Sequence, residues 1–367
     1  MAPSLEEISA ASRVAERGEG IGADELHLAS RNHALPLEAL RLDVTPPGLH
    51  YVLTHYDIPH VDPATWQLTL DGLVDRPLGL DLATLVSLPR HTVRATLECA
   101  GNGRAALEPR PVSQPWLNGA VGTADWTGVR LRDLLDRAGV SADAVDVVFT
   151  GLDHGIERGV EQDYQRGLSL AEARRDDVLV AYEMNGGPLP PQHGFPARLV
   201  VPGWYGMASV KWLASVTVSG EEFDGYQHHA YRVKQHVDDP GVPVTWIEPR
   251  ALLVPPGFPD FMTRARVVRP GRVVLEGRAW SGWGPVERVE VSTDDGVTWS
   301  EVSMGPDAGR WAWRGFTATW DAVPGEHALR VRAYDATGRA QGTEPVWNRG
   351  GFTNNADQPV PCLVLDE

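Results

Sequence analysis

Cysteine is scarce in this sequence: among 367 residues, only Cys99 and Cys362 occur. Two thiols are too few for a Cys₄ zinc site or for an iron–sulfur cluster held by cysteines alone. The sequence also lacks a Cys-x-x-Cys-His haem motif and a His-Glu-x-x-His zinc motif. Nothing in the cysteine count indicates a disulfide-based fold.

Long apolar runs and an excess of positive charge are also missing. No segment approaches the length of a membrane span, and the N-terminus has neither the apolar region of a secretion signal nor a twin-arginine pair. We therefore expect a cytoplasmic protein without a membrane partner, or a periplasmic one if a signal peptide has been removed. The formal net charge of -16 argues against general nucleic-acid binding, although it allows a local cationic pocket for a small anion.

The length and the order of the elements favour an α+β fold in two domains. A chain of 367 residues suits two domains, and the high contents of glycine (38) and proline (29) favour loops and strands over helical bundles. Strand-like runs and short helices alternate without a βαβ rhythm in the first part. A proline-rich linker follows at residues 233–257, and the short strands after it predict an immunoglobulin-like sandwich.

These patterns predict three parts: an N-terminal helical segment (1–44), a mixed domain (45–238), and a linker with the sandwich domain (239–367). Within the mixed domain, residues 129–138 carry apolar side chains at helical spacing and end at Gly139, which predicts a helix with a left-handed cap. Within the sandwich, residues 286–299 predict a hairpin with its turn at 294–296.

Cys99 ends the clearest strand pattern in the chain. Apolar side chains alternate with polar ones through residues 91–99, and the thiol is the last member of the apolar face. The chain then turns at Gly101-Asn-Gly103 and continues with Arg104. A thiol on a rigid strand, beside a glycine loop and a cation, is typical of a reactive thiolate or a metal ligand. The alternative is a small buried hydrophobe, as free cysteines often are.

A second segment gathers cations around glycine turns at residues 203 and 206. His193, Arg198 and Lys211 lie close together in sequence, with the hydroxyl of Ser209 between the last two. Cations, hydroxyls and open backbone amides of this kind hold buried phosphates in proteins. The segment therefore indicates a phosphate site, and the alternative is a β-hairpin with exposed basic residues.

Five short motifs follow one another along the chain. They are Glu98-Cys-Ala-Gly-Asn102, Asp125-Trp-Thr-Gly-Val-Arg-Leu-Arg-Asp-Leu-Leu135, Ala181-Tyr-Glu-Met-Asn-Gly186, His193-Gly-Phe-Pro-Ala-Arg198 and Val210-Lys-Trp212. Together, in this order, they resemble the sulfite oxidase family of molybdenum enzymes. The resemblance extends from about Thr45 to the C-terminus. The part after Gly271 is similar to the family's immunoglobulin-like dimerisation domain, which implies a homodimer.

The resemblance implies a molybdenum ion held by molybdopterin, a pyranopterin dithiolene, with Cys99 as the metal's protein ligand. The implied contacts with the cofactor are Tyr51, His55, Asp153, His193, Arg198, Ser209, Val210 and Lys211. It also implies a substrate pocket that holds Arg104 and Tyr231 beside Cys99. A guanidinium suits a small oxyanion because it combines charge with forked donors, and a phenol can donate to a substrate oxygen.

One departure from the family concerns the substrate pocket. Family members commonly place an arginine there, within Arg-Asn-His near the start of the fold, whereas this chain has Leu53-Thr54-His55 at the aligned position. Arg31-Asn-His33 has the same letters but lies upstream, and we interpret it as chance or as a separate role. A missing positive charge weakens oxyanion binding, so a substrate like that of thiosulfate-oxidising relatives, which act on protein-bound sulfur, is an alternative.

The sequence thus predicts a molybdenum-dependent oxidoreductase that moves an oxygen atom from water to a small sulfur oxyanion, with sulfite to sulfate as the first choice. The alternatives on the same scaffold are oxidation of sulfane sulfur and reduction of a sulfoxide or nitrate. A non-enzymatic immunoglobulin-like binding protein would explain the second half alone. Because the chain has no haem or cluster motif, we expect an external electron acceptor, either a cytochrome or a diffusible compound.

Overall fold

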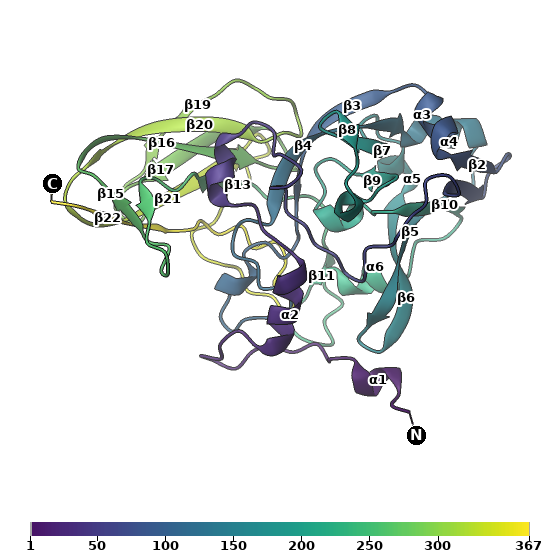
Figure 1. Cartoon of the computed structure of the whole chain (residues 1–367), viewed down its shortest axis with the longest axis horizontal. Coiled ribbons are helices and arrows are strands. Elements are labelled where there is room, and N and C mark those ends of the chain that lie inside the picture. The colour runs from purple at the N-terminus through teal and green to yellow at the C-terminus, as the bar shows by residue number, and fades with distance from the viewer. Residues whose placement is uncertain (1, 367) are drawn as a thin grey trace.

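The computed structural model describes residues 2–366, which form two strand-rich domains side by side (Figure 1). The first domain combines two sheets with short helices, and the second is a sandwich of two sheets. The α+β class and the order of the two domains were predicted from the sequence and are confirmed.

The strands of the first domain are β1 (Gln67–Gly72), β2 (Leu78–Asp81), β3 (His91–Glu98), β4 (Val121–Arg130), β5 (Asp146–Glu157), β6 (Val160–Ser169), β7 (Leu179–Met184), β8 (Gly187–Pro188), β9 (Arg198–Val200) and β10 (Leu213–Ser219). One sheet has the order β2-β1-β10-β5-β6, in which β1 and β10 run parallel. The other has the order β3-β4-β7-β8, with β9 paired to β7. The predicted strand before Cys99 is β3.

Short helices connect these strands. They are α1 (Leu5–Ile8), α2 (Ala23–Arg31), η1 (Leu37–Arg41), α3 (Leu82–Ser87), η2 (Arg104–Ala106), α4 (Leu131–Ala138), α5 (Leu170–Ala173), η3 (Pro191–His193), η4 (Gly206–Ala208) and α6 (Tyr226–Ala230). The helix predicted over 129–138 is α4, whose first two predicted residues belong to β4 instead. Gly139 ends α4 at a φ of 72°, which glycine adopts without strain. Within residues 2–366, no helix has both the length and the apolar composition to span a membrane.

The second domain is a two-sheet sandwich that follows a short pair formed by β11 (Arg232–Val233) and β12 (Val242–Pro243). Its strands are β13 (Arg250–Leu253), β14 (Phe258–Pro259), β15 (Arg266–Val268), β16 (Gly271–Trp280), β17 (Val286–Ser292), β18 (Ser300–Glu301), β19 (Ser303–Met304), β20 (Arg314–Ala322), β21 (Gly325–Asp335) and β22 (Val360–Val364). The sheet orders are β13-β16-β20-β19 and β14-β15-β22-β21-β17-β18.

Two predictions about this half are corrected. The hairpin predicted over 286–299 pairs β17 with β18, which begins only at Ser300. The turn is longer than predicted because the Asp294 carboxylate accepts hydrogen bonds from both the amide and the hydroxyl of Thr298. The predicted linker also contains β13, which pairs with β16, so the sandwich begins at Arg250.

The N-terminal segment is not a separate part, because it crosses both domains (Figure 1). Leu35 and Leu40 belong to the main hydrophobic core. Arg278 of β16 donates to the backbone oxygens of Leu40 and Arg41, and the Trp313 indole donates to the backbone oxygen of Asp43. Residues 35–43 therefore connect the two domains.

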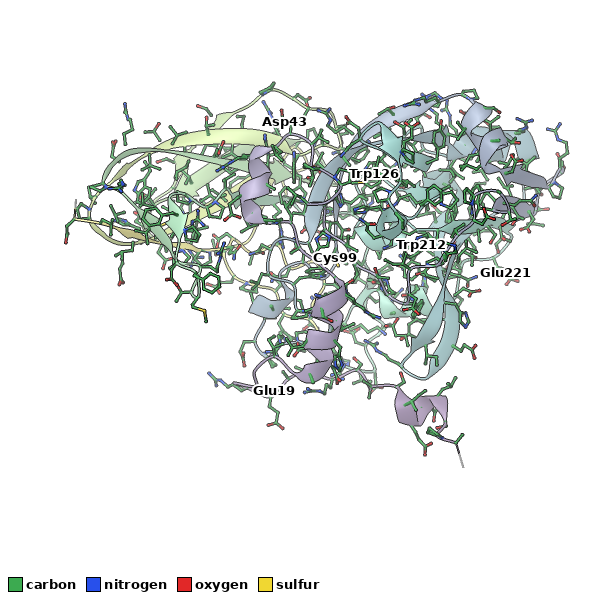
Figure 2. All side chains as sticks on the ribbon, viewed as in Figure 1. Glu19, Asp43, Cys99, Trp126, Trp212 and Glu221 are labelled. Carbon is green, nitrogen blue, oxygen red and sulfur yellow. The ribbon has the colours of Figure 1, made fainter. Side chains whose placement is uncertain are left out.

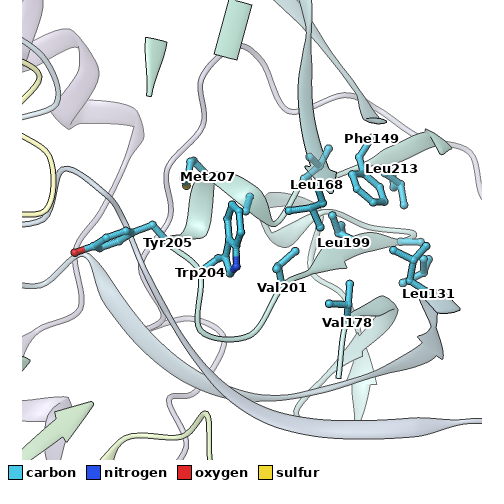
Figure 3. Packing of buried hydrophobic residues seen from close by; sticks show 14 of the residues in the cluster. Leu131, Phe149, Leu168, Val178, Leu199, Val201, Trp204, Tyr205, Met207 and Leu213 are labelled. Carbon is cyan, nitrogen blue, oxygen red and sulfur yellow. The ribbon is translucent and has the colours of Figure 1, made fainter. Parts of the chain in front are cut away.

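The main core of the first domain extends into the second, which also has a hydrophobic core of its own. Figure 3 shows buried side chains of the first domain, among them Leu131, Phe149 and Leu213, packed between its elements. The same cluster continues into the second domain through Trp280 and Trp313. Continuous packing of this kind resists relative domain motion and keeps the loops between the domains rigid.

Candidate active site

A pocket lies in the first domain, where segments distant in the sequence meet. Nine predicted site residues line it: Tyr51, His55, Cys99, Asp153, His193, Arg198, Ser209, Lys211 and Tyr231. The nine residues come from six separate segments between positions 51 and 231, so it is the fold that brings them together.

Cys99 follows β3 directly and lies near the centre of the molecule, as Figure 2 shows. Its amide donates to the Ala120 carbonyl (2.9 Å), and its carbonyl accepts from the Asn102 amide (2.9 Å). Burial raises the pKa of the thiol, although the charge of Arg104 acts in the opposite direction. A free reactive thiolate is therefore disfavoured, whereas a metal ion would deprotonate the thiol on binding.

Glu98, immediately before Cys99, fixes the end of β3 from beneath. One carboxylate oxygen accepts a hydrogen bond from the side-chain amide of Asn102 (2.9 Å) and lies 3.2 Å from Nε of Arg250. The other oxygen accepts from the Trp280 indole at 2.7 Å. Arg250 and Trp280 belong to the sandwich domain, so the position of the thiol depends on both domains.

Residues 51–55 form an extended segment along one side of the pocket, and Arg31 and Asn32 hold it. The Thr54 amide donates to the Asn32 side-chain oxygen (2.7 Å), and Arg31 donates to the His55 carbonyl (2.9 Å). His33 and Val52 pair as an isolated bridge. The Arg31-Asn-His33 tripeptide, which we interpreted as chance or as a separate role, therefore positions the segment that carries Leu53.

Two cations, the buried Arg198 and the half-buried Lys211, face the pocket without carboxylate partners within ion-pair distance in the part of the chain that the structure describes. Arg198 donates to the backbone oxygens of His193 and Ser209, and Lys211 donates to those of Leu53 and Gln192. Their charges lie over the rings of Trp126 and Trp212, which Figure 2 labels. Burial lowers the pKa of Arg198 to about 10 and that of Lys211 to about 7.

Tyr231 and His55 form a hydrogen-bonded pair at the pocket wall. The Tyr231 hydroxyl lies 2.8 Å from Nε2 of His55. Burial lowers the pKa of His55 to about 3 and raises that of Tyr231 well above its usual value. Both groups are therefore uncharged near neutral pH, and the pair offers hydrogen bonds without adding charge.

Two family models match the chain: the oxidoreductase molybdopterin binding domain over residues 55–227, and the Mo-co oxidoreductase dimerisation domain over residues 259–360. The chain is 38% identical over 340 residues to the sulfite oxidase of Gallus gallus, an alignment that covers 85% of this chain and 72% of that protein. The chain belongs to the sulfite oxidase family. It is a molybdopterin-dependent oxidoreductase, and the predicted family and cofactor are confirmed.

Other members of the wider group differ in their named reactions. A nitrate reductase [NADH] of Volvox carteri is 33% identical over 341 residues, which cover 85% of this chain and 39% of that protein. The solved structure of the sulfane dehydrogenase SoxCD from Paracoccus pantotrophus superposes with a TM-score of 0.77 at 26% identity, covering 94% of this chain and 92% of that one. The comparisons therefore identify the cofactor but do not identify the substrate, because these relatives are named for different reactions.

The pocket fits the cofactor of the sulfite oxidase family. Cations without carboxylate partners favour an anion, and Arg198, Ser209 and Lys211 would hold the phosphate end of molybdopterin. Asp153 is 4% exposed, and one of its carboxylate oxygens has no hydrogen-bond partner among residues 2–366. Gly206 leaves room for the Tyr51 hydroxyl, which would lie 2.2 Å from a Cβ atom at this position. Cys99 would bind the metal.

Two predicted site residues do not line the pocket. Arg104 is 5% exposed and packs against Gly101, where it donates to the backbone oxygens of Gln114 and Gly350. It lies close enough to act on the charge of Cys99, but behind the pocket wall. Val210 faces the hydrophobic core, because its backbone pairs with Leu199 and turns its side chain inward.

The pocket also contains residues that sequence reasoning missed. They are His50, Leu97, Tyr164, Gln192 and Met207. Gly206, which the sequence predicts to offer its amide to phosphate, lines the pocket and also leaves room for Tyr51. Gly203, predicted for the same role, packs against Trp311 at the domain boundary. Tyr164 lies on β6, where buried and exposed side chains alternate as in any strand, so the sequence does not indicate that it belongs to a site.

Removal of the cofactor should make stability depend steeply on pH. Burial lowers the pKa of His50 to about 4 and that of His193 to about 2, and both side chains are 2% exposed. The unfolded chain takes up these protons below about pH 6.5, so the stability of the cofactor-free protein falls as pH drops from there, by up to about 1.4 kcal/mol per pH unit for each histidine. The cofactor's anionic phosphate should reduce this slope.

Denaturant unfolding between neutral pH and about pH 5, with and without cofactor, measures the difference. His193→Gln should flatten the slope of the cofactor-free protein, and the exposed His60→Gln serves as the control that leaves it unchanged. Equal slopes for the loaded and the cofactor-free protein would contradict an anion bound beside these histidines.

Proposed function

We propose that this chain oxidises sulfite to sulfate, with the added oxygen atom taken from water. The observation that carries the proposal is one pocket in which the Cys99 thiol lies together with the cations Arg198 and Lys211, while Arg104 is held close behind the thiol. Such a site suits an anionic cofactor and a small oxyanion, because guanidinium and ammonium groups combine charge with several donors. The relative named sulfite oxidase supports the same substrate class.

When bound, the molybdenum cofactor supplies two-electron oxygen-atom transfer with water as the source of oxygen. The residues of this chain position that chemistry. Cys99 would hold the metal, while Arg198, Ser209 and Lys211 would hold the phosphate end of the pterin. Because these charges are fixed before the substrate arrives, they need not reorganise as charge develops on the substrate.

Tyr231 supplies a hydrogen bond toward the substrate. When His55 donates from Nε2 across the 2.8 Å contact, the Tyr231 hydroxyl is free to donate to a substrate oxygen. The ring of Phe352 from the second domain packs against Tyr231 (5.2 Å between ring centres), and the guanidinium of Arg104 lies 5.3 Å from the same phenylalanine ring. The second domain thus fixes both groups.

Oxidation of a sulfane sulfur is the second candidate. Leu53 lines the pocket at the position where family members commonly carry an arginine, so the pocket has one positive charge fewer for an oxyanion. An apolar side chain instead favours a bulkier or less charged sulfur substrate. The superposition with a sulfane dehydrogenase supports this candidate.

Variants of Arg104 and Leu53 separate the two substrates. Arg104→Gln should raise the KM for sulfite by less than about tenfold, because the lost charge acts from behind the pocket wall and not through a direct contact with the substrate. Leu53→Arg should lower the KM for sulfite, since it restores a cation at the pocket wall. We would measure kcat/KM for sulfite, thiosulfate and a sulfane-bearing peptide with dye acceptors, and for nitrate with reduced dyes.

Arg272→Gln, at an exposed position of β16, is the matched control and should leave every substrate unaffected. If Arg104→Gln leaves sulfite kinetics unchanged, the substrate anion binds elsewhere. If Leu53→Arg harms the sulfane substrate while it improves sulfite, sulfane sulfur is the native substrate.

The proposal includes the surroundings of the enzyme. Electrons pass to an external acceptor, a cytochrome or a diffusible compound, and the protein works in the cytoplasm as a homodimer. The match of residues 259–360 to a dimerisation domain supports the homodimer. A monomer mass in light scattering at micromolar concentration would contradict it.

A further inference from the structure

The inward face of β5 carries two carboxylates, Asp153 in the cofactor pocket and Glu157 outside it, and the proposed function gives no role to Glu157. Side chains alternate along a strand, so Asp153, Gly155 and Glu157 share one face. Asp153 lines the pocket, and Glu157 is the last residue of β5, at the end of the β5–β6 hairpin. The two carboxylates are roughly 13 Å apart along the strand. A line of polar groups therefore leads from the pocket toward the hairpin end.

Tyr56 fills the gap between these carboxylates. A Cβ atom at Gly155 would lie 2.4 Å from the Tyr56 ring, so this glycine allows the ring to cross the strand face. The Tyr56 hydroxyl is buried and, like one oxygen of Asp153, has no hydrogen-bond partner within the described chain. Asp153 and Glu157 both lie near enough to raise the pKa of Tyr56, which is raised mainly by burial.

More unpartnered polar groups surround the far end of this line. Among residues 2–366, the Gln227 amide oxygen and the Gln162 amide nitrogen are buried without a partner, and the Tyr226 hydroxyl and the Gln227 amide nitrogen have none beyond the neighbouring Glu157 carboxylate. Tyr226 and Gln227 belong to α6 and lie beside Glu157. Figure 1 shows the β5–β6 hairpin reaching toward α1, with α6 beside it. Buried polar groups are nearly always hydrogen-bonded, so a cluster of them without protein partners indicates bound water.

We propose that water held along this face of β5, between Asp153, Tyr56 and Glu157, carries protons from the pocket to solvent. The inference rests on the proposed function. Oxidation of one sulfite by one water gives sulfate, two protons and two electrons; the electrons pass to two one-electron acceptors, such as ferricyanide, and the protons must leave a buried pocket. Glu157 delivers them to solvent at the hairpin end, next to the exposed Arg158.

The charges around the two carboxylates suit proton exchange. Burial raises the pKa of Asp153 to about 6 against the opposing charge of Lys211, and burial raises the pKa of Glu157 against that of Arg158. Carboxyl groups with a pKa near the working pH accept and release protons readily. The titratable or charged groups that face them are Tyr56, Arg158, Asp163, Tyr164, Lys211 and Tyr226. Glu6 of α1 packs against Gly159 at the hairpin end.

Glu157→Gln tests this path in the molybdenum-loaded enzyme. It keeps the shape of the side chain but cannot carry a proton, so kcat for sulfite should fall by at least roughly tenfold while KM stays unchanged. The rise of kcat with pH that follows ionisation of Glu157 in the wild type should be absent in this variant. Glu157→Asp should restore part of kcat, and imidazole buffer should restore part of the activity of the glutamine variant. Glu161→Gln, on the exposed face of the same hairpin, is the matched control.

A second measurement does not depend on turnover. Because the folded pKa of Glu157 is raised, the wild type loses stability relative to Glu157→Gln as pH rises from about 4.5 through that pKa. Denaturant unfolding of both proteins should show this growing difference, and a pH-independent difference would overturn the buried-carboxyl assignment. Unchanged kcat and pH profile in Glu157→Gln would overturn the path itself. A wild type that does not oxidise sulfite would instead refute the proposed function.

Discussion

Cys99→Ser should lower turnover more than about 100-fold while the fold survives, a loss larger than supporting contacts around a metal ligand usually produce. A hydroxyl is far less acidic than a thiol and is a harder ligand, so serine cannot replace the thiolate that completes the metal site. The side chain is 7% exposed and nearly isosteric with serine, and the backbone hydrogen bonds of the loop do not involve the sulfur.

Steady-state kinetics together with metal analysis and circular dichroism would test this expectation. Cys362→Ser is the control, since that thiol is buried in the sandwich domain away from the pocket and its loss should leave turnover intact. Near-normal turnover of Cys99→Ser at full molybdenum content would refute the assignment of Cys99 as the ligand.

Glu98→Gln should have the largest effect on stability, a loss of about 3–5 kcal/mol in the free energy of unfolding. Glu98 is 1% exposed and Arg250 is 2% exposed, and their side chains meet at 3.2 Å. The neutral amide leaves the Arg250 guanidinium buried without its counter-charge. The Trp280 indole, which donates to the same carboxylate, also loses its charged acceptor. Chemical denaturation measures the loss.

Two further variants sharpen this experiment. Asp321→Asn removes a pair with Arg272 in which both side chains are about 80% exposed, so unfolding should change by less than about 0.5 kcal/mol. The double change Glu98→Gln with Arg250→Met removes the unpaired charge and should recover part of the stability. A single Glu98→Gln variant as stable as the wild type would show that the pair contributes nothing.

Local patterns predicted the elements that carry the thiol and much of the cofactor pocket. The alternation through residues 91–99 gave β3 and placed Cys99 at its end, and helical spacing with Gly139 gave α4. Both depend on neighbours in the sequence, which is why periodicity suffices. The motifs around His193 and Lys211 gave the cation site for the same reason.

Contacts between distant segments could not be predicted in this way. No local pattern shows that Asn32 holds Thr54, or that Glu98 meets Arg250 across more than 150 positions. Arg104 was expected inside the pocket, but Gly101 lets it fold back toward Gly350 instead. The line of carboxylates on the inward face of β5 could not be predicted from the sequence, because Asp153 and Glu157 have the spacing of ordinary strand residues.

The contact between Arg104 and Gly350 bears on how the enzyme matures. The two residues are 246 positions apart, and Trp280 and Arg250 reach Glu98 from similarly late parts of the chain. During synthesis the thiol segment therefore emerges long before the residues that fix it. A chain still attached to the ribosome lacks the residues that fix the cofactor pocket. We therefore expect molybdopterin to bind only when translation is nearly complete.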